Sequence, residues 1–216
     1  NFNQDGKQDR HRERLRLRVG ANYKIADELR AGARVVTGNS DDPNNIHQDL
    51  GSVFNSFEIS FDRLFLNYSP EWFPGSSFTG GKFTHPFYQN PVFGELVWDG
   101  DVSPEGIVGV YNGKEACVLD KFQLIAGGYI IQEQSNADEG YMFVFQGSVH
   151  TSPADNCTLD VALGYYLFGD TSPSGSRTIL GDNAGNAVVD TNSDGTADQF
   201  LSDFGILNPI IASTYR

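Results

Sequence analysis

Residues 10–25 alternate between two kinds of side chain. The even positions are basic, polar or glycine, and from position 15 the odd positions are apolar. The even set is Arg10, Arg12, Arg14, Arg16, Arg18, Gly20, Asn22 and Lys24, and the odd set is Leu15, Leu17, Val19, Ala21, Tyr23 and Ile25. Because successive side chains of a β-strand point to opposite faces, this alternation predicts one strand with an arginine face and an apolar face. The apolar face needs either a protein core or lipid beside it.

Two architectures satisfy that requirement. In a soluble, ligand-binding β-sandwich a second sheet buries the apolar face, whereas in an outer-membrane β-barrel it meets lipid and the polar face lines a water-filled lumen. The composition favours the barrel, because 24 glycines in 216 residues, 12% aromatic residues and a mean hydropathy of −0.35 are typical of many strands joined by polar loops. No stretch approaches the ~18 apolar residues of a membrane helix. No second set of fully apolar strands is present to cover the first.

Charge is distributed unevenly along the chain, whose net charge is −13. Residues 1–40 contain nine Lys and Arg residues against five Asp and Glu residues, while the rest of the chain contains six against 23. A nucleic-acid-binding protein would present a broad basic face, so we expect no nucleic-acid partner. A basic strip within an acidic protein instead fits a surface that faces the interior of the protein.

Further segments predict a series of strands, at residues 29–35, 61–69, 77–84, 107–111, 120–134, 141–150, 158–169 and 204–216. Compact turns and long polar connections alternate between them, the long ones at 37–60, 85–106 and 170–203. Outer-membrane barrels have this arrangement, with short periplasmic turns and long extracellular loops.

About nine strands with two free ends do not close a sheet, and unpaired strand edges are not tolerated in lipid. The fold prediction is therefore all-β, an antiparallel transmembrane β-barrel. We expect residues 1–216 to form a single β-barrel domain that is a fragment of a larger barrel, with closing strands missing at both ends.

Four blocks of sequence resemble the bacterial outer-membrane proteins called putative porins, and their order and spacing agree over roughly residues 9–110. The blocks are Asp9-Arg10-His11-Arg12-Glu13-Arg14-Leu15-Arg16-Leu17-Arg18-Val19-Gly20, Phe61-Asp62-Arg63-Leu64-Phe65-Leu66-Asn67-Tyr68, Thr79-Gly80-Gly81-Lys82 with Pro86-Phe87, and Val97-Trp98-Asp99 with Pro104-Glu105-Gly106. The resemblance implies a pore-forming β-barrel of the Gram-negative outer membrane without enzymatic activity.

A set of basic residues is expected to lie opposite the apolar side chains of its strands and to line the pore. The set is Arg10, Arg12, Arg14, Arg16, Arg18, Arg30, Arg34, Arg63 and Lys82. Arginine stays charged at any physiological pH, and rows of Arg or Lys suit the passage of anions or phosphates. The alternative is that these residues pair with acids of neighbouring strands and only keep a large lumen wet.

Two stretches have the spacing of oxygen ligands in calcium loops. The first is Asp190, Asn192, Asp194 and Asp198 with the backbone carbonyl of Thr196, and the second is Asn1, Asn3, Asp5 and Asp9. Leu201 occupies the position of the bidentate Glu of an EF-hand, with Asp203 as a possible substitute. Calcium is the only cofactor these patterns suggest, and ordinary turn chemistry of Asp, Asn and Gly is the alternative.

The two cysteines, Cys117 and Cys157, lie beside turns of adjacent predicted hairpins. They could form a disulfide in an oxidising periplasm, or remain two unpaired small residues.

Aromatic residues near short turns, Tyr23, Tyr68, Trp72 and Phe73, match an interfacial girdle. The four histidines lack metal-ligand spacing, and no Gly-x-Ser-x-Gly elbow, phosphate loop or Cys/His pair is present, so we expect no enzyme.

The functional prediction is an outer-membrane porin whose channel lets small hydrophilic solutes, anions among them, diffuse passively through an arginine-lined lumen. Its expected partners are outer-membrane lipid, these solutes, and further copies of itself in a homotrimer. The alternative is a structural or surface-layer envelope barrel with calcium-stabilised extracellular loops.

Overall fold

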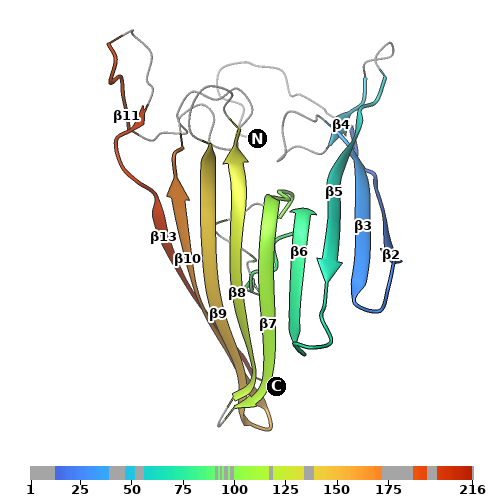
Figure 1. Cartoon of the computed structure of the whole chain (residues 1–216), viewed down its shortest axis with the longest axis vertical. Coiled ribbons are helices and arrows are strands. Elements are labelled where there is room, and N and C mark those ends of the chain that lie inside the picture. The colour runs from blue at the N-terminus through green and yellow to red at the C-terminus, as the bar shows by residue number, and fades with distance from the viewer. Residues whose placement is uncertain are drawn as a thin grey trace, which may run out of the picture.

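The computed structural model describes residues 13–38, 47–51, 56–90, 92, 94, 97, 100–116, 119–133, 139–171, 187–193 and 199–215. Nine strands form one antiparallel sheet in the order β13-β10-β9-β8-β7-β6-β5-β3-β2 (Figure 1). They are β2 (Arg18–Lys24), β3 (Leu29–Thr37), β5 (Ile59–Tyr68), β6 (Ser76–Lys82), β7 (Glu105–Ala116), β8 (Leu119–Gln132), β9 (Gly140–Ala154), β10 (Cys157–Gly169) and β13 (Gly205–Tyr215). The predicted all-β, antiparallel fold of about nine strands is confirmed.

The sheet is open, because in the described part of the chain its edge strands β2 and β13 each pair on one side only. Two small ladders accompany it, one of β1 (Arg14–Leu15) with β4 (Gln48–Asp49) and one of β11 (Val188–Val189) with β12 (Gln199–Phe200). Within the described residues no helix is long and apolar enough to cross a membrane.

The single strand expected over residues 10–25 is wrong at its N-terminal part. Arg14 and Leu15 pair with β4, away from the large sheet, and regular pairing with β3 begins at Arg18, one residue after the carbonyl of Leu17 accepts from the backbone N–H of Thr37 at 3.1 Å. Between the two strands, the backbone N–H of Leu17 donates to Oγ1 of Thr37 at 2.9 Å. This side-chain acceptor replaces a ladder hydrogen bond, so the strand is interrupted there.

Short and long connections alternate as the sequence predicts, except that the connection over 133–139 between β8 and β9 is no longer than that over 69–75. Residues 25–28, 69–75 and 155–156 join β2 to β3, β5 to β6 and β9 to β10, and these junctions lie toward the lower end in Figure 1, where β7 also ends and β8 begins. The longer connections, over 38–58, 83–104 and 170–204, start and finish at the opposite end.

One face of the sheet, called here the outer face, carries large apolar side chains that stand exposed. Cross-strand neighbours share a face, so the row Phe78, Gly109, Ala126, Phe145, Tyr165 and Leu207 lies together on it. Val19 is 56% exposed, Leu64 60% and Phe145 56%. The described residues supply no second layer over these side chains, so the β-sandwich alternative lacks its covering sheet.

The opposite face, called here the inner face, carries the buried core. Tyr129, Met142, Val144 and Tyr166 project from β8, β9 and β10 and are almost completely buried. The chain between β6 and β7, residues 83–104 and called here the inserted segment, covers them with Phe83, Phe87 and Val102. The described part of this stretch is irregular as predicted, but it packs against the inner face of the sheet, whereas the sequence led us to expect an external loop.

Aromatic packing and one hydrogen bond hold the inserted segment in place. The ring of Phe87 meets those of Tyr166 and Tyr129 edge-on, at centroid distances of 5.5 and 6.4 Å. One residue further on, the backbone N–H of Tyr88 donates to Oε1 of Gln146 at 2.6 Å. Edge-to-face aromatic pairs add stability beyond the area they bury, so the segment is part of the core.

Candidate solute-facing site

The inner face of β2, β3 and β5 carries a group of arginines. Arg34 of β3 lies opposite Arg63 of β5, and Arg30 lies between Lys24 and Asn67. Arg18 occupies the same face at the start of β2, where it pairs with Val36. The alternation of the sequence therefore predicts the face of these four arginines correctly. Arg10 and Arg12 lie outside the described residues.

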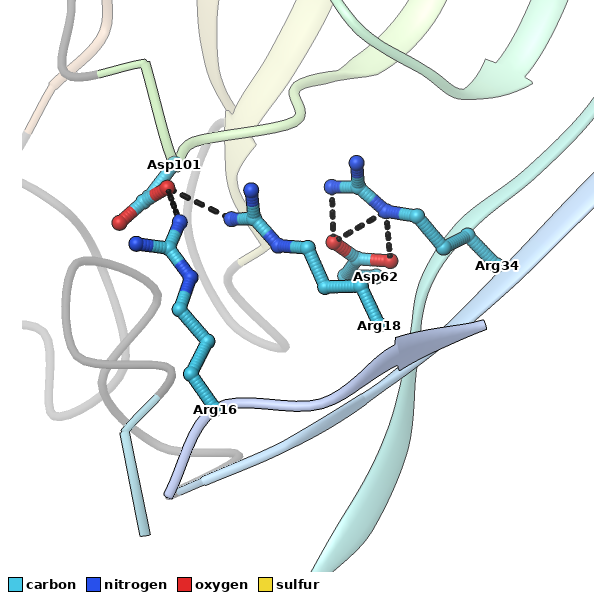
Figure 2. A network of polar contacts seen from close by, with 5 residues as sticks. All are labelled: Arg16, Arg18, Arg34, Asp62 and Asp101. Carbon is cyan, nitrogen blue, oxygen red and sulfur yellow. Dashed lines mark hydrogen bonds and ion pairs between the residues drawn. The ribbon is translucent and has the colours of Figure 1, made fainter. Parts of the chain in front are cut away.

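A β-bulge adds an acid to this face. Arg34 pairs with Arg63 and Val35 with Phe61, so Asp62 is the extra residue of β5. Nε of Arg34 donates to both carboxylate oxygens of Asp62 at 2.9 Å, and Nη2 forms a further short contact (Figure 2). The side chains are only 15% and 11% exposed. Strict alternation would have put Asp62 beside Leu64 on the outer face.

Glycine makes room for this ion pair. A Cβ at Gly20 of β2 would lie 3.2 Å from Cγ and 3.3 Å from Cβ of Arg34. The aliphatic part of the Arg34 side chain therefore packs directly against Gly20. This keeps the guanidinium close to the surface of the sheet and within reach of Asp62.

A second acid comes from the inserted segment. Oδ1 of Asp101 accepts from Nη2 of Arg16 at 2.5 Å and from Nη2 of Arg18 at 2.6 Å (Figure 2). Burial alone would raise the pKa of Asp101, but hydrogen bonds and charge from Arg18 and Arg16 outweigh it and hold this pKa below its usual value. Asp101 therefore stays ionised and ties the inserted segment to the arginines.

Two arginines of the set keep an uncompensated charge. Arg30 and Arg63 form no ion pair with any described acid at salt-bridge distance, although Asp62 lies near enough to Arg63 to interact with it through space. Nε of Arg63 is buried without a hydrogen-bond partner in the described structure. Burial, and then the charge of Arg63, lower the pKa of the neighbouring His85 to about 4, so His85 is neutral at pH 7. Arg16, Arg18, Arg34 and Arg63 thus outnumber Asp62 and Asp101.

The remaining members of the basic set have different surroundings. Arg14 pairs with Asp49 at 2.8 Å in the small β1–β4 ladder. Lys82 pairs with Leu64 and Glu105 in register and contacts Oε1 of Glu105 at 2.8 Å. Because Leu64 lies on the outer face, the expectation that Lys82 lines the inner face is wrong. Within β6 the register runs without a shift, so Lys82 lies on the same face as Phe78, four residues earlier.

The expected calcium loops lie mostly outside the described residues, which exclude Asp194, Thr196, Asp198, Asn1, Asn3, Asp5 and Asp9. At the described part of the first loop, the backbone N–H of Ser193 donates to Oδ1 of Asp190 at 2.7 Å, and Ser193 has a φ of 61°. An Asp side chain that accepts from the backbone N–H three residues on is a local side-chain-to-backbone hydrogen bond of an Asp-rich turn. Among the described residues no three His, Cys, Asp or Glu side chains converge on a metal position.

The cysteines and the aromatic residues near the turns complete the predicted sites. Cys157 is a free thiol at the start of β10, and Cys117 lies outside the described residues. The ring of Phe73 stacks between Trp72 and Tyr111, at centroid distances of 5.9 and 5.3 Å. Trp72 is 75% exposed in the turn between β5 and β6, and its place in an interfacial girdle stays a prediction.

Sequence reasoning did not find Asp62, Asp101 or His85. The only local signal of the bulge is that Asp62 is an acid next to Arg63 in sequence and could pair with a basic residue, Arg34, on the neighbouring strand. Asp101 and His85 belong to an irregular segment, and their approach to the arginines depends on how Phe83 and Phe87 pack.

Comparison with known proteins gives one match. A family model described as putative porin is similar to the chain over residues 2–203. Nothing among the curated proteins or the solved structures matches it.

Proposed function

The chain belongs to the putative porin family, and from that premise we propose that its inner face lines a water-filled outer-membrane channel for passive diffusion of small hydrophilic solutes, anions in particular. The family supports a porin-type function and an outer-membrane location in general. The choice of solute and the role of the arginines are our proposal.

The contrast between the two faces of the sheet carries this proposal. The outer face exposes apolar side chains from β2 to β13, among them Val19, Leu66 and Leu207, while charged groups gather on the inner face of β2, β3 and β5. Exposed apolar patches beyond a few hundred Å² mark contact with lipid or another protein. A membrane-spanning strand alternates in this manner between lipid and water.

Incomplete pairing of the arginines supports the preference for anions. Asp62 and Asp101 neutralise only part of the wall, and the guanidiniums of Arg30 and Arg63 form no ion pair with a described acid. A fixed positive excess beside a narrow aqueous passage raises the local concentration of anions.

The inserted segment supports a limit on solute size. It occupies space on the inner face and is fixed at both ends, by Phe87 in the aromatic cluster and by Asp101 on Arg16 and Arg18. We propose that solutes pass beside this segment, so that the segment narrows the channel.

Conductance distinguishes the channel from a structural barrel. The purified full-length protein is added to planar lipid bilayers under a KCl gradient. We expect discrete ohmic steps and a reversal potential displaced toward that of chloride. Insertion without conductance steps would contradict the channel and favour the alternative of a calcium-stabilised structural barrel.

A further inference from the structure

A second polar region lies on the inner face, away from the arginines and near the short β7–β8 and β9–β10 turns. It forms a hollow of about 240 Å³ between β7, β8, β9, β10 and the inserted segment. Its polar lining side chains are those of Tyr88, Asn112, Lys114, Lys121, Gln123, Ser148, His150 and Asp160. Drug-sized ligands occupy roughly 300–1,000 Å³, so this hollow suits a smaller solute.

Two lysines stand side by side in the hollow. Lys114 of β7 is the direct cross-strand neighbour of Lys121 of β8. Like charges directly opposite each other on a strand pair are destabilising, and no described acid forms an ion pair with either lysine. The nearest carboxylate along the same row, Asp160, is bound to Nδ1 of His150 at 2.7 Å. An acid group that contacts both ammonium groups would relieve their repulsion.

The groups around the lysines are held in fixed orientations. Nε2 of Gln123 donates to Oδ1 of Asn112 at 2.9 Å, which leaves the amide nitrogen of Asn112 and the amide oxygen of Gln123 for a ligand. His150 engages Asp160 through Nδ1 and keeps Nε2 available. Ser148 lies next to Gln123 in register and adds a hydroxyl.

The phenol of Tyr88 borders the hollow from the inserted segment. Its backbone is fixed by the hydrogen bond to Gln146. Burial, and then the charge of Asp160, raise the pKa of Tyr88, which is consistent with a phenol that stays protonated close to that carboxylate. The phenol therefore offers an O–H donor and an aromatic face to a bound molecule.

We propose that this hollow is a binding subsite for a small polyhydroxylated acid, of the size and chemistry of a monosaccharide carboxylate. Lys114 and Lys121 hold its carboxylate, and Asn112, Gln123, Ser148 and Tyr88 hold its hydroxyls. This inference rests on the proposed function, because it names a solute class for the same inner face, but it concerns a place distinct from the arginines.

The test measures equilibrium binding by titration calorimetry of the full-length protein in detergent, with glucuronate and with its uncharged counterpart glucose. We expect glucuronate to bind about tenfold more tightly, since charge-assisted hydrogen bonds are the stronger ones. The double variant K114Q/K121Q should lose this difference. The control K82Q removes the same charge on the outer face, and its affinity for glucuronate should match that of the wild type.

A second variant separates the hydroxyl contacts from the charge. N112A leaves both lysines in place and should weaken the binding of glucose and the binding of glucuronate by the same factor. Heat-modifiable migration on SDS gels establishes that each variant is folded. Equal affinities of the wild type for glucose and glucuronate, or equal weakening by K82Q and K114Q/K121Q, would overturn the proposal.

The outcomes for the subsite and for the channel are separable. Conductance in bilayers without glucuronate binding in detergent would refute the subsite and leave the channel intact. Glucuronate binding that depends on the lysines, without conductance, would support the subsite and refute the channel.

Discussion

Nε of Arg34 donates to both carboxylate oxygens of Asp62, at 2.9 Å each, across the bulge that interrupts the pairing of β3 with β5. The bulge turns the carboxylate of Asp62 onto a face where Arg18 and Arg63 also lie. Without that carboxylate, the arginines would gather on this face with too little negative charge between them. The relationship explains how the sheet tolerates a cluster of cations.

Removal of this carboxylate should destabilise the protein. D62N leaves Arg34 largely buried and uncompensated, and we expect a loss of about 2 kcal/mol in the free energy of unfolding, the scale of a hydrogen bond to a charged group. Urea unfolding in detergent or vesicles measures it. The control D27N breaks an exposed pair with Lys24 and should change stability by less than about 0.5 kcal/mol. Equal effects of the two variants would contradict a structural role for Asp62.

Removal of an uncompensated arginine should weaken anion preference. R63Q subtracts a positive charge that forms no ion pair with a described acid, so the reversal potential in a KCl gradient should move toward that of potassium. The matched control R14Q/D49N removes a pair without changing net charge and should leave the reversal potential within error. An unchanged value for R63Q would exclude Arg63 as a determinant of selectivity.

Release of the inserted segment should widen the channel. D101N abolishes the charge-assisted contacts with Arg16 and Arg18, so larger neutral sugars should enter liposomes faster in a swelling assay. The use of neutral sugars removes the effect of the altered charge. D49N, the same change in the small ladder, is the control. Equal swelling rates for wild type and D101N would show that Asp101 does not hold the segment.

The contact of Asp101 should also survive mild acid. Because its pKa in the folded state is lowered, its contribution to stability is present above the pKa of the unfolded state. That contribution is lost only as the pH falls through the lowered value. Swelling rates of the wild type should therefore be constant between pH 7 and pH 5, and a rise in that window would contradict the account.

His85 should make the protein less stable in mild acid. Its pKa is near 4 when folded and near 6.5 when unfolded, so the unfolded state binds more protons between these values and stability falls as the pH is lowered. Between pH 7 and pH 5 we expect a loss of about 2 kcal/mol by urea unfolding. H85Q should remove most of it. If H85Q lost the same free energy of unfolding between pH 7 and pH 5, the pH dependence would come from a group other than His85.

The strands could be predicted from the sequence because their side chains alternate with period two. Leu64, Leu66, Arg63 and Asn67 lie on the faces that this period assigns to them. The period fails where a local contact overrides it, as at Leu17, whose N–H bonds to Thr37, and at Asp62, which the bulge redirects. At Lys82 the period holds, and the expectation was wrong because Lys82 has the parity of Phe78, whose side chain lies on the outer face.

The candidate site could be predicted only in part, because some of its residues come together only through tertiary packing. The face of Arg18, Arg34 and Arg63 follows from the strand pattern. Their partner Asp101 is on another element, 83 residues away from Arg18 in sequence. No periodic signal links the two, and the packing of Phe83 and Phe87 decides where the inserted segment lies.

The central claim is that the outer face of the sheet meets lipid while the inner face meets water. Nitroxide labels at L66C and N67C, adjacent on β5, test it in liposomes with Cys117 and Cys157 replaced by serine. We predict that the label at position 66 is relaxed mainly by oxygen, which concentrates in lipid, and the label at 67 mainly by a water-soluble nickel chelate. Equal access of the chelate to both positions, or the reverse order, would contradict the account.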